Sequence, residues 1–139
     1  MLAALLGLCC ETQGEAPEPA CVDFDAAGCA PLYPPVFDDV FTRTLVPSCA
    51  TGGGSCHASA SALGATDRGF FVDDADATHA RLLEDRGDAS FVDQGDAQCS
   101  QIIVRLTIDD DELRMPPGSE LAAGEICSVA QWIEMGAVR

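Results

Sequence analysis

Residues 123–137, AGEICSVAQWIEMGA, carry the clearest helical pattern in the chain. The apolar residues of this stretch recur at the three- and four-residue spacing of one helix face, at Ile126, Val129, Ala130 and Ile133. Gly136 follows them, at the position where a left-handed glycine commonly ends a helix. We expect a helix from Ala123 to Met135 that packs its apolar face, with Trp132 and Met135, into the core.

Three further helices are predicted upstream of this one. The first begins near Val36, ends at Pro47, and has its apolar face at Phe37, Val40, Phe41, Thr44 and Leu45. The second covers Asp76–Asp85 with Asp76 as its cap, and the third lies in DAQCSQIIVRLTID, residues 96–109. Residues 69–74 and 89–94 are too short to be assigned as strands. The predicted fold is a small, mostly α domain of about four helices with long loops, at residues 36–139.

Charge excludes two classes of partner. The chain has 23 acidic residues against 7 basic ones, and its net charge is −16. Nucleic-acid phosphates and anionic lipid headgroups both require a basic surface. We therefore expect no nucleic-acid partner and no charge-driven docking on a membrane.

Eight cysteines in 139 residues indicate an oxidising compartment. The first ten residues, MLAALLGLCC, are apolar and resemble the end of a lipoprotein signal, with Cys9 or Cys10 as the residue that would carry lipid. We therefore expect an exported protein, in the periplasm or at the outer membrane or cell surface, with a lipid tether as its contact with the membrane.

Residues 11–35 have no apolar periodicity and are rich in proline, so we expect a linker that does not pack on the domain. Cys21 and Cys29 enclose seven residues and suggest a small disulfide loop. For Cys99 and Cys127 we expect a disulfide that joins the third helix to the last one.

The most informative motif is SCATGGGSCHASA at residues 48–60. It contains Cys-His, the ending of a c-type haem attachment site, in which two residues usually separate the cysteines. Here six residues separate Cys49 from Cys56, and three of them are glycines that can bulge outward. The spacing leaves two alternatives open, namely haem attachment or a Cys49–Cys56 disulfide.

Four segments together resemble a known family. They are Cys49 with Cys56 and His57, GDAQCSQIIVRL (95–106), RMPPGSEL (114–121) and EICSVAQWIEMGA (125–137). Residues 36–138 thus resemble the class I cytochrome c domain, and most closely the planctomycete-type cytochrome c domains of exported bacterial proteins. Ala122 departs from the hydroxyl residue that usually caps the last helix in that family.

The resemblance implies a haem c cofactor and a role for each matching residue. Cys49 and Cys56 would form thioethers to the haem, His57 would be the proximal iron ligand, and Met115 would be the distal ligand. A His/Met-ligated iron has no open position for substrate, so the resemblance implies electron transfer and no enzymatic turnover. The redox partner is not indicated.

The enlarged cysteine gap supports an alternative function, a haem-free lipoprotein module with disulfide staples that keeps the fold for binding or structure. A zinc site of Cys49, Cys56, His57 and His79 matches no zinc spacing. The acidic stretch at residues 73–84 fails the calcium-loop pattern, because alanines and a threonine occupy the required positions.

Overall fold

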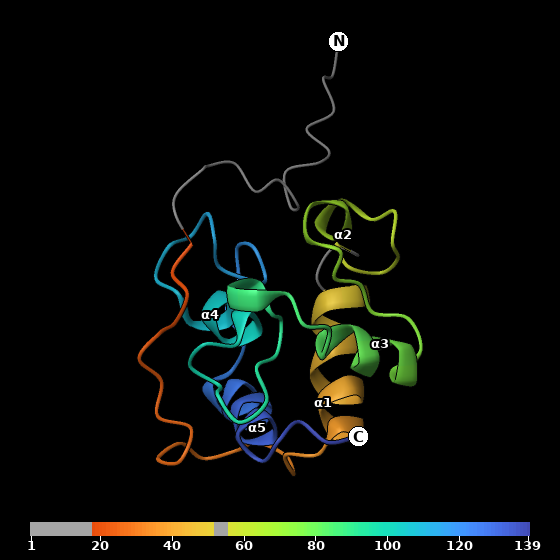
Figure 1. Ribbon diagram of the computed structural model, residues 1–139. Helices are drawn as coiled ribbons and strands as arrows, with labels where there is room; N and C mark the ends of the chain where they lie inside the picture. The colour runs from red at the N-terminus through yellow and green to blue at the C-terminus, as the bar shows by residue number, and fades with distance from the viewer. Residues whose placement is uncertain (1–17, 52–55) are drawn as a thin grey trace.

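The computed structural model describes residues 18–51 and 56–139. Within these ranges the chain is mostly helical (Figure 1). The elements in chain order are α1 (Phe37–Val40), η1 (Phe41–Thr51), α2 (Leu63–Arg68), α3 (Ala75–Leu82), η2 (Gly87–Ala89), α4 (Gln101–Thr107) and α5 (Ala123–Glu134). The prediction of a small, mostly α domain held by disulfides is confirmed. The signal-like residues 1–10, with Cys9 and Cys10, and glycines 52–54 lie outside the described residues.

Helix α5 forms the centre of the core and packs against both α1 and α4. Trp132 is 1% exposed, and its indole Nε1 donates a hydrogen bond to the carbonyl of Val138 at 2.9 Å. The helix ends as predicted, with Gly136 at a φ of 96° and the Ala137 N–H bonded to the Trp132 carbonyl. Met135 differs from the prediction: it is 57% exposed and lies outside the core.

The first helix does not end at Pro47 as predicted. Helix α1 continues directly into η1, an 11-residue π-helix that contains Pro47 and ends at Thr51. Proline disrupts an α-helix by its missing N–H and by a clash with the carbonyl four residues earlier. In a π-helix each backbone N–H bonds to the carbonyl five residues earlier instead of four. The helix can therefore continue through Pro47, and Cys49 lies in its last turn.

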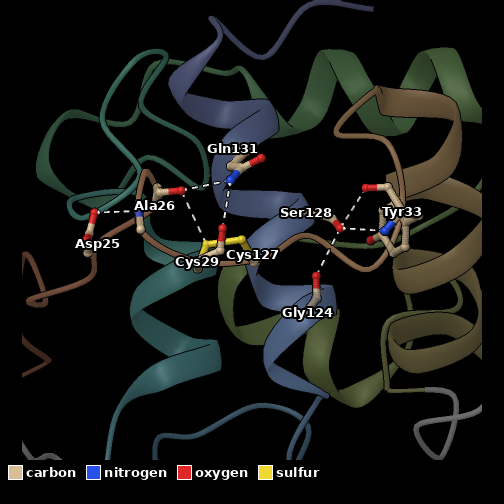
Figure 2. Close-up of a disulfide and its surroundings, with 9 residues drawn as sticks. Asp25, Ala26, Cys29, Tyr33, Gly124, Cys127, Ser128 and Gln131 are labelled. Carbon is tan, nitrogen blue, oxygen red and sulfur yellow. Dashed lines mark hydrogen bonds between the residues drawn. A yellow bond between two sulfur atoms is a disulfide. The ribbon is translucent and has the colours of Figure 1, made fainter.

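Two disulfides tie the N-terminal segment to the helical core, and their pairing corrects our expectation. Cys21 is bonded to Cys99, and Cys29 is bonded to Cys127 on α5 (Figure 2). The structure therefore forms neither the Cys21–Cys29 loop nor the Cys99–Cys127 bridge. Both cysteines of the segment expected as a linker instead reach partners 78 and 98 residues away.

The N-terminal segment also packs through buried side chains, so residues 18–35 do not behave as a free linker. Ala26 and Tyr33 are buried, and Val22 and Phe24 contact the same core. The Ser128 hydroxyl on α5 accepts from the Tyr33 N–H at 3.1 Å and lies 3.0 Å from the Tyr33 carbonyl, as Figure 2 shows. Residues 18–35 lack apolar periodicity because they form an extended segment, which is held by two disulfides and by individual side-chain contacts.

Smaller differences concern the edges of elements. Asp74, and not Asp76, caps α3, because its carboxylate accepts from the Ala77 N–H at 3.0 Å. Helix α2 had no sequence signal, since it is short and polar. In the described part of the chain the only β pairing is an isolated bridge between Asp93 and Asp96. No helix there has the length and apolar character to cross a bilayer.

Candidate cofactor site

A cavity of about 350 Å³ with a mostly apolar lining lies between η1, α2, α4 and the loop at residues 115–117. Its volume falls within the range of sites that bind small molecules and cofactors. All four residues that the sequence singled out line it: Cys49, Cys56, His57 and Met115. The structure thus brings together side chains that lie up to 66 positions apart in the sequence.

Three hydrogen bonds fix the position of His57. Its backbone N–H donates to the Cys49 carbonyl at 3.1 Å, and its own carbonyl accepts from the Val72 N–H at 2.7 Å. The ring Nδ1 lies 2.8 Å from the Phe70 carbonyl. Because a carbonyl can only accept, Nδ1 carries the proton. The lone pair of Nε2 is therefore free to bind a metal ion.

The surroundings of His57 favour the neutral imidazole. Burial lowers the pKa of His57 below its usual value of 6.5, although the hydrogen bond to the Phe70 carbonyl acts in the opposite direction. The Phe70 ring also packs on the imidazole, with 5.1 Å between the ring centroids. A neutral imidazole is the form that coordinates iron.

Gly64 of α2 leaves open the space beside the free ring nitrogen. A Cβ at this position would lie 3.1 Å from His57 Nε2, 3.0 Å from His57 Cε1 and 2.8 Å from the Cys56 carbonyl oxygen. Any other residue would therefore crowd the atom that a metal would need. This position fits a metal-bearing cofactor at Nε2, and no motif in the sequence marks Gly64.

The two cysteines of the motif are in different states. Cys49 is a free thiol, and burial raises its pKa to about 12. The structure thus lacks the Cys49–Cys56 disulfide that the spacing left open. Cys56 is 5% exposed and is disulfide-bonded, so a thioether at Cys56 would require that bond to be reduced first.

Helix α4 holds the Met115 loop at two points. The Met115 N–H donates to the Arg105 carbonyl at 2.8 Å, and the Arg105 guanidinium donates to the Leu113 carbonyl at 2.8 Å. Pro116 and Pro117 line the cavity beside the methionine. The thioether of Met115 is therefore carried by a loop that is anchored on a core helix.

His79, the second histidine of the chain, makes packing contacts and a hydrogen bond outside the cavity. His79 Nε2 lies 2.8 Å from the Ala137 carbonyl, and its ring packs edge-on against Phe37 with 4.7 Å between centroids. It is not among the residues that line the cavity. Residues 18–51 and 56–139 contain no group of three or more His, Cys, Asp or Glu side chains that could hold a metal ion. A His/Met pair is a different kind of ligand set, completed by the cofactor itself.

Sequence reasoning missed the charged side of the cavity. Arg68, Arg86, Arg105 and Glu18 all contribute to the lining. No motif marks them, because each is an isolated charge in a chain of scattered charges.

Comparison with known proteins found no matching family model, no matching curated protein and no matching solved structure.

Proposed function

We propose that this chain is an exported c-type cytochrome-like electron-transfer module that binds haem in the cavity lined by His57 and Met115. The observation that carries this proposal is the convergence of Cys49, Cys56, His57 and Met115 on one apolar cavity. When bound, haem would supply a one-electron iron couple.

The chain's own residues have separate roles in this proposal. His57 would hold the iron through Nε2, with its tautomer set by the Phe70 carbonyl. Met115 offers a soft thioether as the other ligand, which favours ferrous iron. The apolar lining excludes water, and Gly64 keeps the space at Nε2 open. Because two side chains would hold the iron and leave no position for a substrate, we propose no catalytic turnover.

Covalent attachment through Cys49 and Cys56 is part of the proposal and sets a condition on maturation. The sulfur of Cys56 is disulfide-bonded and that of Cys49 is a protonated thiol. Attachment therefore needs a reducing step before the two thiols can react with the haem vinyl groups. The cavity and the positions of His57 and Met115 do not depend on that step.

One observation favours a second candidate function, a haem-free module. The Cys21–Cys99 and Cys29–Cys127 disulfides hold the N-terminal segment on the core by covalent bonds within the chain. Such a domain could serve as a stapled binding or structural module.

The pyridine-haemochrome spectrum of the full chain, exported from a host with haem-attachment machinery, tests the two candidates. The first function predicts a coloured protein whose haem survives denaturation and whose mass includes one haem. His57→Gln should lose the native low-spin spectrum, while the matched control His79→Gln should keep it. A colourless product that also fails to take up added haemin would overturn the proposal in favour of the haem-free module.

A further inference from the structure

Three of the chain's seven arginines, Arg68, Arg86 and Arg105, line the candidate cavity. Glu18 and Asp67 line the same cavity, so the three arginines leave a small excess of positive charge beside this apolar space, in a protein with a net charge of −16. Arg68 ends α2 and Arg105 lies on α4, so two of the elements that wall the cavity each contribute a guanidinium.

The carboxylate of Glu18 lies between two of these arginines. One of its oxygens accepts from Arg105 Nε, and the other lies 2.7 Å from Arg68 NH1. The side chains of Glu18 and Arg105 are only 15% and 13% exposed. Burial by itself raises the pKa of Glu18, but the hydrogen bonds and charges of Arg105 and Arg68 outweigh it and lower the pKa below its usual value. Glu18 is therefore an ionised carboxylate in a partly buried arginine pair.

A second observation is a buried polar atom in the cavity lining that lacks a hydrogen-bond partner in the described part of the chain. Gln101 is 7% exposed and lines the same cavity, yet its Oε1 has no hydrogen-bond partner in the described part of the chain. Its amide nitrogen makes only a long contact of 3.4 Å, with the Ala20 carbonyl. A buried acceptor without a partner costs free energy, so this polar position is not filled by the protein itself.

These features describe a site for an apolar molecule that carries a carboxylate. Two guanidinium groups suit a carboxylate, because charge-assisted hydrogen bonds to arginine are strong and geometrically specific. A partly buried arginine that lost Glu18 would need another anion, since an unpaired buried charge is costly. An ionised carboxylate cannot donate to Gln101 Oε1, but a water between them can donate one hydrogen to each.

We propose that Arg68 and Arg105 form a carboxylate subsite of the cavity, and that Glu18 occupies this subsite until a carboxylate of a flat apolar ligand displaces it. The ligand's apolar body then fills the cavity, and the Glu18 side chain moves into solvent. The proposal rests on the proposed function only in one respect, namely that the ligand is a porphyrin, whose two carboxylates supply the anion.

Fluorescence titration of the full chain, purified without haem, tests this subsite. The probes are protoporphyrin IX, which has two carboxylates, its dimethyl ester, and pyrenebutyrate with its methyl ester. Glu18→Gln should bind both acids more tightly than the parent, on the order of tenfold, because the internal competitor is gone. It should not change the binding of either ester. Arg68→Gln, at a residue whose side chain is 52% exposed and thus tolerant of change, should weaken binding of the acids and leave the esters alone.

Glu120→Gln is the matched control, because Glu120 pairs with Arg114 and does not line the cavity. Protoporphyrin binding that ignores both Glu18 and Arg68 would overturn the subsite and leave the proposed function standing. If protoporphyrin fails to bind but pyrenebutyrate binds in a Glu18-dependent way, the subsite is supported. The ligand is then not a porphyrin, and the proposed function is wrong. If neither acid responds to Glu18→Gln, or if acid and ester respond equally, the subsite proposal is wrong.

Discussion

The backbone N–H of His57 donates a hydrogen bond to the carbonyl oxygen of Cys49 at 3.1 Å, although seven residues lie between them. In an uninterrupted helix the N–H of a residue bonds to the carbonyl four positions earlier. A Cys-x-x-Cys-His sequence would make this same bond between its first cysteine and its histidine. The four additional residues therefore leave the relation between the helix end and the histidine intact.

This relation predicts the effect of shortening the loop. Deletion of residues 52–55 turns the motif into Cys-Ala-Thr-Cys-His, with the spacing of an ordinary haem attachment site. We expect the deleted chain to fold and to acquire covalent haem in higher yield than the parent, as measured by haem stain after denaturing electrophoresis. Deletion of the four residues 11–14, which lie far from the motif in the sequence, is the control. A deleted chain that folds but gains no haem would contradict the expectation.

Gly64→Ala should impair the site through crowding at His57. The added Cβ would meet the Cys56 carbonyl oxygen at 2.8 Å and the His57 ring at 3.0 Å. We expect a loss of about 1–3 kcal/mol in the free energy of unfolding, as for overpacked positions. Haemin uptake should fall further than this loss of stability explains. Leu63→Ala, at a neighbouring residue that is 61% exposed, should change neither measurement. Normal uptake by Gly64→Ala would show that the space at Nε2 is not needed.

Met115→Ala should leave any covalent haem in place and remove the thioether ligand. A methionine ligand raises the potential of haem iron, so the midpoint potential should fall and the ligand-sensitive visible spectrum should change. Met135→Ala is a direct control, because Met135 is 57% exposed and does not line the cavity. An unchanged potential and spectrum in Met115→Ala would rule out this residue as the ligand.

His57 should give the haem-free protein a measurable pH dependence. Burial holds the folded-state pKa of His57 below its usual value of 6.5. In the window between the two pKa values the unfolded chain binds more protons, so the free energy of unfolding rises with pH there and falls as the pH drops below 6.5. Denaturant unfolding from pH 7.5 to pH 5 measures this slope. His57→Gln should flatten it, and an equal slope in the parent and in His57→Gln would contradict the assignment.

The long-range disulfides should carry much of the stability. Cys29→Ser combined with Cys127→Ser should lower the free energy of unfolding by about 2–5 kcal/mol, because the bond closes a very long loop in the unfolded chain. A chain that begins at Pro34 loses both staples and the buried Tyr33, and it should be destabilised further. Peptide mapping without reduction should recover Cys21 with Cys99 and Cys29 with Cys127. Recovery of Cys21 joined to Cys29 would refute this pairing.

The sequence predicted best those features that follow from local patterns. Helix α5 was predicted within a residue at either end, because its apolar spacing and Gly136 act locally. The same local reasoning failed at Pro47, since it assumed α-helical winding. It also failed at the disulfides, because four cysteines allow three pairings and sequence proximity does not choose among them.

The cavity residues also divide into those that local motifs predict and those that depend on contacts between distant segments. Cys49, Cys56, His57 and Met115 could be named in advance, because each belongs to a short motif. Glu18, Gly64 and Arg105 could not, because their positions depend on how distant segments meet. Glu18 in particular lies in a segment with no periodic signal, and two disulfides hold the rest of that segment on the core.

The Cys21–Cys99 and Cys29–Cys127 disulfides also impose an order on folding. Each joins an early cysteine, Cys21 or Cys29, to a partner 78 or 98 residues later in the chain. The first bond cannot close before residue 99 has been made, and the second cannot close before Cys127, the fifth residue of α5, has been made. Until then the segment that carries Glu18 has no covalent hold on the core, and the cavity wall that it supplies is missing. The period before oxidation is thus the time when a large flat ligand could enter with the least obstruction.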